Sequence, residues 1–362
     1  MTTSAFWEPH AHVRLVHDNK TSVATLGGIG ALLINFNTAA CTLRCLDSLL
    51  GGSVQPRWIL VLDNASAPAD LATLQQGIAS RSGAVIRLYV SEVNLGFAAG
   101  SNFLLQALMA EPECRHALLL NNDAVADARM VARLSQLIDQ EDGQVDLAGG
   151  RMHQLAEPDS VDTLGIAIYA SLMPADRKTL DDPYWGPTGG CCLLSRRLVQ
   201  RLQEVSGYCF DPRYFCYCED TDMVVRSRLL GFSVHYIDAV LAYHQGQASS
   251  GGGHNDFIAY HGLRNSLWMH VKLFPAYLFM RYGLVLVAAH GMTIVRYVLS
   301  GRMRVLLRVY RDGFSQVPAF WRERRVFKRH ITARRHEIRP LVAPHFYRKG
   351  YLRMVLNQFI HS

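Results

Sequence analysis

Short apolar runs alternate with helix-patterned segments over residues 29–127, and this alternation limits the possible folds more than any other feature of the sequence. The apolar runs lie at 29–37, 58–66, 84–94 and 116–127. Segments with apolar residues at helical spacing lie at 38–52, 71–83 and 96–111. Such an order predicts strands that alternate with helices. It therefore predicts an α/β domain built on a mostly parallel sheet flanked by helices.

Each of these apolar runs ends in polar residues. They are Asn35, Asn37, Asp63, Asn64, Asn94 and Asp123. Ligands of open α/β sheets bind beyond the carboxyl ends of the strands. We therefore expect these side chains to form one polar rim along one edge of the sheet, and this rim is the first candidate for a binding site.

A cluster of acids follows an aromatic, cysteine-flanked run in the segment 214–223, YFCYCEDTDM. Asp222 and Arg226 stand four positions apart on a predicted helix, so a structural ion pair is the expected role for Asp222. Glu219 and Asp220 lie at the start of that helix, where a carboxylate can cap the helix or protrude. A protruding Asp220 beside aromatic side chains could serve as a general base.

The second half of the chain is less regular than the first. We expect a glycine turn, a strand and a helix over 186–202, a short helix over 221–231 and a strand over 232–244. Glycines and serines at 246–253 are typical of a loop. His244 ends the last of these strands, and a lone histidine in such a place is more often structural than catalytic.

Two further motifs are weak by themselves. LLLNNDA (118–124) ends a buried strand with oxygen-bearing side chains that suit Mg²⁺ or Mn²⁺, but Asn-Asp at a strand end is also ordinary turn chemistry. In NLGFAAGSN (94–102), Gly96 and Gly100 would let the backbone approach a ligand. The segment has neither the dinucleotide-binding glycine spacing nor a Walker loop.

The eight cysteines are scattered along the chain. The N-terminus lacks the charged-then-apolar pattern of a signal peptide. Free thiols in a reducing cytoplasm are therefore the simplest interpretation. Cys216 and Cys218 are separated by one residue and have no second pair, which argues against a zinc site.

The C-terminal part of the chain is strongly basic. From Arg296 to Arg353 the sequence has 16 Lys and Arg against 3 acids, so the rest of the chain is net acidic. Such a tail favours an anionic partner. The longest uncharged stretch there, Tyr282–Val295, has 14 residues, fewer than the ~20 of a spanning helix. Two interpretations stay open: a peripheral amphipathic membrane attachment, and helices packed on the body with a solvated basic face.

Taken in order, these parts resemble family 2 glycosyltransferases of the GT-A fold. The closest branch is the bacterial rhamnosyltransferase-like group, which acts in cell-surface polysaccharide (O-antigen) synthesis. The resemblance spans about residues 29–270 and rests on seven motifs. They are NFN (35–37), LDNAS (62–66), NLGFAAGSN (94–102), LLLNNDA (118–124), GPTGGCCLLSRR (186–197), FDPRYFCYCEDTDMVVRSRLLGF (210–232) and AYHQGQASSG (242–251).

The resemblance also implies a domain organisation. An N-terminal arm would occupy residues 1–28, and a GT-A (Rossmann-like) catalytic domain residues 29–257. A helical, basic, membrane-associating region would occupy residues 258–362.

Site roles follow from the same resemblance. Asp220 would be the catalytic base. The donor-binding residues would be Asn35, Asn37, Asp63, Asn94, Gly96, Asn102 and Asn122. The residues near the sugar and acceptor would be Trp185, Gly189, Gly190, Cys191 and Glu219. Asp123 and His244 would bind Mg²⁺ or Mn²⁺. Asn121 stands where a strict Asp-x-Asp motif has its first acid, and this neutral ligand lowers the expected metal affinity.

The implied reaction is an inverting transfer of a sugar from a nucleotide donor. The resemblance favours dTDP-L-rhamnose as donor, with UDP-linked galactofuranose, glucose or N-acetylglucosamine as alternatives. The acceptor would be a glycan precursor on a polyprenyl diphosphate, at the cytoplasmic face of the inner membrane.

Two rival functions differ in class. A nucleotidyltransferase would carry a basic, glycine-rich triphosphate loop near the first strand, and NFNTAACT (35–42) has none. A nucleic-acid-binding protein would use the basic tail, but the apolar content of that tail argues against it, so we expect no nucleic-acid partner.

Overall fold

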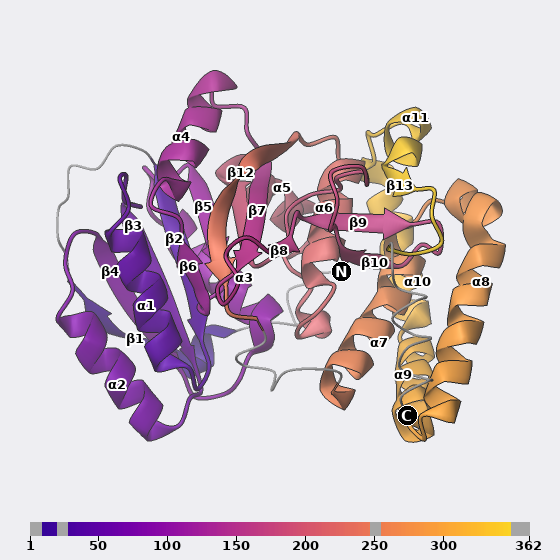
Figure 1. Cartoon of the computed structure of the whole chain (residues 1–362), viewed down its shortest axis with the longest axis horizontal. Helices are drawn as coiled ribbons and strands as arrows, with labels where there is room; N and C mark the ends of the chain where they lie inside the picture. The colour runs from indigo at the N-terminus through magenta and orange to yellow at the C-terminus, as the bar shows by residue number, and fades with distance from the viewer. Residues whose placement is uncertain (1–8, 20–27, 247–254, 349–362) are drawn as a thin grey trace.

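A ten-stranded sheet forms the centre of the computed structural model, which describes residues 9–19, 28–246 and 255–348 (Figure 1). Its strand order is β1-β4-β3-β2-β5-β11-β7-β12-β6, with β8 paired to β7. The strands are β1 (Val13–Asp18), β2 (Ile29–Asn35), β3 (Trp58–Asn64), β4 (Val85–Ser91), β5 (His116–Leu120), β6 (Ala124–Ala126), β7 (Leu147–Gln154), β8 (Val161–Thr163), β11 (Cys191–Ser195) and β12 (Val234–His244).

Helices cover both faces of the sheet, because successive strand residues point to opposite sides. On β2, Leu33 packs with α1, α2 and α4, whereas Leu32 packs with α3, α5 and α6. The bounds of these helices are α1 (Ala39–Leu50), α2 (Pro68–Ala79), α3 (Gly96–Met109), α4 (Met130–Gln140), α5 (Arg196–Ser206) and α6 (Glu219–Leu229). The predicted α/β architecture is confirmed.

The parallel part of the sheet brings the strand ends together. Strands β2, β3, β4 and β5 run parallel, and Asn35 of β2 lies in register with Asp63 of β3. The antiparallel strand β11 separates this part from β7 and β12. The sheet therefore places the polar ends of strands that are distant in sequence along one edge.

The N-terminal arm differs from the sequence-based expectation. Residues 13–18, expected to belong to a variable arm, instead form β1 and pair antiparallel with β4. A bulge between Leu15 and His17 interrupts that pairing, which obscures the alternation that would have indicated a strand. The loop expected at 246–253 lies almost wholly outside the described residues.

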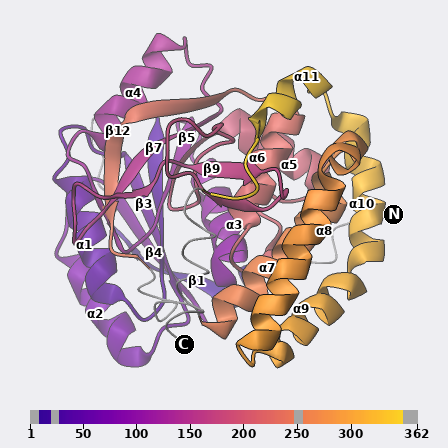
Figure 2. The same cartoon turned by 45° about the vertical axis from the view of Figure 1, so that its right-hand side comes forward.

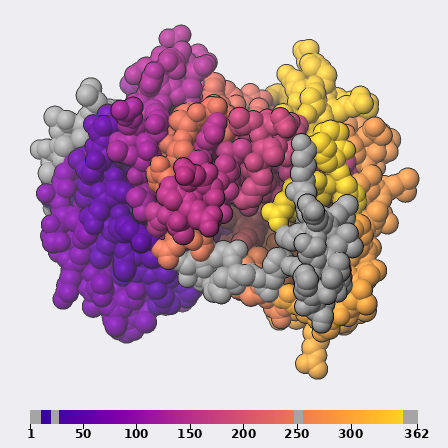
Figure 3. All heavy atoms as spheres, in the orientation of Figure 1, coloured from indigo at the N-terminus to yellow at the C-terminus, as the bar shows by residue number. Residues whose placement is uncertain are grey.

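Helices dominate the C-terminal region and pack beside the α/β body (Figures 2 and 3). They are α7 (Asp256–Leu273), α8 (Ala276–Leu299), α9 (Met303–Ser315), α10 (Val317–Phe327) and α11 (Arg335–Ile338). Single 3₁₀ turns lie at Pro9–His12, Pro212–Tyr214, Lys328–His330 and Arg339–Leu341. A small second sheet contains β9 (Ile166–Tyr169), β10 (Pro174–Asp176) and β13 (Val342–Ala343).

Several contacts join this region to the body. Strand β13 pairs with β9, and the backbone carbonyl of Leu341 accepts a hydrogen bond from the Trp185 indole at 2.6 Å. Arg213 of the body pairs with Glu323 of α10, with 2.6 Å between Nη1 and Oε1. The described C-terminal helices are therefore part of the folded body rather than a separate appendage.

Helix α8 is longer than the uncharged stretch of the sequence indicated. It has 24 residues, and by length and composition alone it could cross a membrane. The 14-residue uncharged stretch therefore understated the length of the apolar helix. Half of the residues of α8 are exposed, including Met280 (80%), Leu284 (89%) and Val287 (69%). The helix thus presents an apolar face that the described residues leave uncovered.

Candidate active site

The ends of β2 and β3 are joined by a buried polar network. Asn35 Nδ2 lies 2.8 Å from Asp63 Oδ1, 2.9 Å from Asp70 Oδ2 and 3.0 Å from Ser66 Oγ. Asn35 and Asp63 are fully buried. Asn37 has a φ of 55° and accepts a hydrogen bond from the Ala67 backbone N–H. These side chains fix the strand ends, and contact between them and a nucleotide stays a prediction.

Asn122 extends this network to the next strand end. Its Nδ2 lies 2.7 Å from Thr38 Oγ1 and 2.8 Å from Thr42 Oγ1, at the start of α1. Thr42 Oγ1 in turn donates to Asn35 Oδ1 at 2.7 Å. The predicted rim is therefore continuous from β5 to β3.

A second group of predicted donor residues surrounds the start of α3. Asn94 Oδ1 accepts hydrogen bonds from Asn64 Nδ2 and from the Gly96 N–H. Gly96 has a φ of 72°, and a Cβ there would lie 2.5 Å from the Phe215 ring. Glycine is required at this position because of both the backbone conformation and the close approach of Phe215.

Asn102 lies deeper, on the buried side of α3. Its Nδ2 donates to the Phe210 carbonyl at 2.6 Å, and its Oδ1 accepts from the Phe210 N–H at 2.8 Å. Both ends of the amide are thus used to attach the segment before α6 to α3. A direct role of Asn102 at the donor stays a prediction.

Asp123 and His244 meet at the edge of the sheet, as the resemblance implies for two metal ligands. The pairing of β12 with β6 places His244 opposite Ala124, and His244 Nε2 lies 3.0 Å from Asp123 Oδ1. Asn121 Nδ2 is 3.2 Å from the same nitrogen. A carboxylate and an imidazole therefore converge on one point.

The second nitrogen of the His244 ring contacts another carboxylate. Nδ1 lies 2.8 Å from Asp162 Oδ2. Burial opposes the charge of His244, but the hydrogen bonds to Asp123 and Asp162 outweigh burial and raise the pKa of the imidazole to about 10. A carboxylate on the distal nitrogen is the usual means of orienting a metal-binding histidine.

The side chains of Asp123 and His244 are suitable ligands for a divalent cation. One carboxylate and one imidazole suit Mn²⁺, and also Mg²⁺ with additional oxygen ligands. Within residues 9–19, 28–246 and 255–348, no group of three or more His, Cys, Asp or Glu side chains is placed to hold a metal ion. Asp123 and His244 therefore fit a site that a ligand completes, not a closed structural site.

Asp220 lies near the start of α6 and is anchored to the glycine turn of 186–190. Asp220 Oδ2 accepts from the Gly189 N–H at 2.9 Å, and Oδ1 accepts from the Thr221 N–H at 2.6 Å. Burial raises the pKa of the Asp220 carboxyl, although the hydrogen bonds from Gly189 and Thr221 oppose that rise. A base with a raised pKa is better matched to proton transfer near neutral pH.

The glycine turn also connects Asp220 to the Asp123 side of the site. The Gly190 carbonyl accepts a hydrogen bond from the Asn121 N–H at 2.9 Å. A Cβ on Gly189 would lie 3.3 Å from Asp220 Cβ, and one on Gly190 would lie 3.4 Å from Asn121 Nδ2. Asp220 and Asn121, which stands two residues before Asp123, therefore contact successive residues of this dipeptide.

Glu219 is buried, with 6% of its surface exposed. Its Oε2 has no hydrogen-bond partner in the described part of the chain. Burial, and then the neighbouring charge of Asp220, raise the pKa of Glu219 well above its usual range. The raised pKa favours the protonated form of this carboxyl, which can donate a hydrogen bond.

The remaining two predicted residues lie in the core. The Trp185 side chain is 1% exposed and donates to Leu341, and Cys191 is 3% exposed and contacts Met130. Neither side chain lies at an open edge in this structure. A role of either residue beside the sugar or the acceptor stays a prediction. All eight cysteines are free thiols.

Asp222 belongs to a buried charge network. The predicted ion pair with Arg226 is present at 2.6 Å, and both side chains are fully buried. Lys272 of α7 places its Nζ 2.8 Å from Asp222 Oδ2 and 2.8 Å from Asp211 Oδ2. An exposed pair would contribute little, whereas this network connects α6 to α7.

The backbone before α6 adopts a strained conformation that α7 stabilises. Phe215, Tyr217 and Cys218 have φ values of 66°, 66° and 65°, a region that non-glycine residues rarely adopt. Asn265 Nδ2 lies 3.0, 2.8 and 2.7 Å from the carbonyl oxygens of residues 214, 216 and 217. Our sequence analysis missed Asn265, because a polar residue within a helix pattern gives no signal of a distant partner.

The model of the glycosyltransferase-like family 2 matches residues 27–257. No curated protein matched the chain.

Two solved structures are similar at low identity. The mannosyltransferase PcManGT from Pyrobaculum calidifontis, in complex with GDP-Man and Mn²⁺, has 13% identity and a TM-score of 0.50, covering 86% of this chain and 89% of that one. TarS 1-349 from S. aureus has 11% identity and a TM-score of 0.50, covering 83% and 88%. This likeness concerns the fold, which is that of GT-A enzymes, and the family match establishes that the chain belongs to glycosyltransferase family 2.

Proposed function

We propose that this glycosyltransferase transfers its donor sugar with inversion of configuration at the anomeric carbon. In this proposal, Asp123 and His244 are metal ligands and Asp220 is the base. The observation that carries the proposal is the arrangement around Gly189 and Gly190. Asp220, whose pKa is raised, accepts a hydrogen bond from Gly189, and Asn121, two residues before Asp123, donates to Gly190; Asp123 in turn contacts His244.

The role of each residue follows from the charge that develops in the reaction. Mg²⁺ or Mn²⁺ at Asp123 and His244 would neutralise the negative charge of the departing nucleoside diphosphate. The structure of PcManGT contains Mn²⁺ and GDP-Man, which supports a nucleotide donor and a divalent metal for this chain.

Asp220 accepts the proton of the acceptor hydroxyl as that oxygen attacks the sugar. A new carbon–oxygen bond forms, and the bond between the anomeric carbon and the diphosphate oxygen breaks. A single displacement of this kind inverts the configuration and needs no carboxylate nucleophile. Glu219, next to Asp220 in the chain, would contact the acceptor or the sugar.

For the nucleotide, Asn35, Asn37 and Asp63 would contact the base and ribose, directly or through the loops they hold. Asn94, Gly96, Asn102 and Asn122 would shape the donor pocket. The resemblance favours dTDP-L-rhamnose, followed by UDP-linked galactofuranose, glucose or N-acetylglucosamine.

The acceptor is a glycan precursor on a polyprenyl diphosphate, and the protein is peripheral at the cytoplasmic face of the inner membrane. The exposed apolar face of α8 and the 16 basic residues between Arg296 and Arg353 support this location. In this proposal, residues 29–257 perform catalysis and 258–362 provide the attachment.

The test is a panel of nucleotide sugars with Mn²⁺ or Mg²⁺, measured as a shift in melting temperature. A donor at 100 times its dissociation constant should add ~2.7 kcal/mol to the free energy of unfolding. Stabilisation by dTDP-rhamnose above all UDP sugars supports the full proposal. A shift with a UDP sugar alone refutes the rhamnose assignment, and no metal-dependent shift with any nucleotide sugar refutes the proposal.

A further inference from the structure

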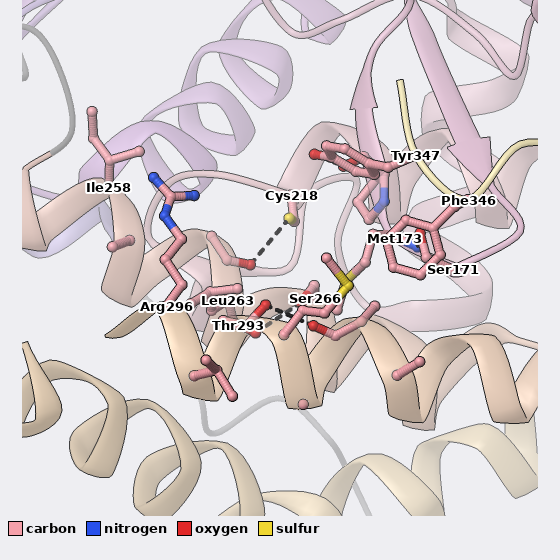
Figure 4. Close-up of a pocket in the computed structure, with 18 of the residues that line it drawn as sticks. Ser171, Met173, Cys218, Ile258, Leu263, Ser266, Thr293, Arg296, Phe346 and Tyr347 are labelled. Carbon is pink, nitrogen blue, oxygen red and sulfur yellow. Dashed lines mark hydrogen bonds between the residues drawn. The ribbon is translucent and has the colours of Figure 1, made fainter. Parts of the chain in front are cut away.

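A cavity of about 700 Å³ lies between α7, α8 and the turn that precedes β10 (Figure 4). Apolar side chains dominate its wall, among them Met173, Ile258, Leu263 and Phe346. Protein interiors are normally close-packed, so a space of this size and composition needs an explanation. An occupant would have to be predominantly apolar.

Small residues on the facing helices keep the cavity open. Gly262 of α7 and Gly291 of α8 both line it, and a Cβ built at either position meets no atom within 4 Å. Ala288, Ala289 and Ser266 also face this space. The two helices therefore leave room for a third, separate apolar body between them.

The cavity is continuous with the exposed apolar face of α8. Met292, Val295 and Leu299 line it, and they are 41%, 56% and 67% exposed. The same helix exposes Met280 and Leu284 further along. An apolar ligand could thus pass from a lipid surface into the cavity without crossing a polar barrier.

Charge and position define the two ends of this path. Arg296 lines the cavity at the end away from Phe346, as Figure 4 shows. Cys218 also lines the cavity, and its Sγ lies 3.7 Å from the Gly262 carbonyl oxygen. Cys218 directly precedes α6, so the wall of the cavity includes a residue that stands two positions before Asp220 in the sequence.

We propose that this cavity binds the hydrocarbon chain of a lipid-linked acceptor, with Arg296 near the lipid phosphate. The inference rests on the proposed function, because it assigns the cavity to the acceptor of that reaction. The apolar wall, the opening toward the α8 surface and the cation at one end match a long chain with an anionic head group.

The test uses farnesyl phosphate as the probe and isothermal calorimetry as the measurement. Gly291→Leu would fill the cavity, whereas Gly283→Leu makes the same change on the same helix, outside the cavity and with no atom within 4 Å of the new Cβ. Both changes raise helix propensity equally. We expect Gly291→Leu to weaken binding about tenfold or more, and Gly283→Leu to match the wild type.

Two further measurements identify which part of the ligand the protein binds. Arg296→Gln should weaken binding of farnesyl phosphate but not of farnesol, and inorganic phosphate alone should not bind. Equal affinities in Gly291→Leu and Gly283→Leu would overturn the inference, as would failure of the wild type to bind farnesyl phosphate. If Gly291→Leu does not fold, Gly262→Leu fills the same cavity from α7.

The two proposals fail in different ways. Nucleotide-sugar binding takes place at the strand ends, so Gly291→Leu should bind donor as the wild type does. A protein that binds nucleotide sugars but not farnesyl phosphate refutes the lipid cavity and leaves the transferase. A protein that binds farnesyl phosphate but no nucleotide sugar refutes the transferase assignment of the site.

Discussion

Replacing Lys272 with methionine should strongly destabilise the protein. Lys272 is 3% exposed, and its Nζ lies 2.8 Å from a carboxylate oxygen of Asp211 and of Asp222, both fully buried. Met keeps most of the volume but removes the cation. Removal of one partner from a buried ionic network typically costs about 3–5 kcal/mol. That is a large fraction of the roughly 5–15 kcal/mol by which domains are stable.

The pH dependence of this effect follows from Asp211. Burial alone would raise the pKa of Asp211, but Lys272 and Arg213 outweigh burial and lower the pKa below its usual range. A carboxyl with a lowered native pKa contributes stability above its unfolded pKa and loses that contribution as the pH falls toward the native value. The difference between wild type and Lys272→Met should therefore be largest at pH 7 and should shrink below about pH 4.

Urea unfolding followed by tryptophan fluorescence at pH 7 and at about pH 3, below the unfolded pKa of aspartate, measures this difference. Lys328→Met is the matched control, because Lys328 is exposed and surface substitutions usually change stability by no more than about 0.5 kcal/mol. The reasoning fails if Lys272→Met is no less stable than Lys328→Met, or if its deficit grows at low pH.

Three other predictions concern the loop before α6, the start of α3 and the α8 surface. Asn265→Leu removes the donor to three carbonyls of the strained loop. The kcat of transfer should therefore fall more than the donor KM changes, and the free energy of unfolding should drop by about 1–3 kcal/mol; unchanged kcat would contradict this. Gly96→Ala should destabilise more than Gly207→Ala in thermal unfolding, because both have a positive φ but only Gly96 meets Phe215; equal losses would contradict it. Leu284→Ser should weaken binding to anionic vesicles by about 1.5–3 kcal/mol, whereas Leu180→Ser, 49% exposed elsewhere, should not; identical vesicle binding would count against α8 as the contact.

Much of the fold could be predicted because local patterns determine it. Apolar runs and helical spacing indicated β2 to β5 and the helices between them, and the parallel arrangement placed their polar ends together. The pair of Asp222 and Arg226 could be predicted because it depends only on helical spacing. The antiparallel insertion of β11 between β5 and β7 could not, because strand order depends on long-range packing.

The supporting residues of the site were less predictable for the same reason. Lys272 is 50 residues from Asp222, and Asn265 is 48 from residue 217. Their partners come from tertiary structure, so no local pattern reveals them. Trp185 was expected near the sugar and acceptor, yet its side chain is buried and donates to Leu341, which is 156 residues away in the C-terminal region. The length of α8 was underestimated because Arg281 and Arg296 bound the uncharged stretch, whereas the helix continues through both residues.

Transfer kinetics of Asp220→Asn and Asp123→Asn, measured with saturating acceptor and varied nucleotide sugar and Mn²⁺, test the central claim most directly. We predict that Asp220→Asn keeps its donor KM while kcat falls by about 10²–10⁴, the usual contribution of general base catalysis. Asp123→Asn should instead lose donor affinity, and excess Mn²⁺ should restore part of it. Near-normal kcat in Asp220→Asn, or an equal loss of donor affinity in both variants, would contradict the separate roles assigned to the two carboxylates.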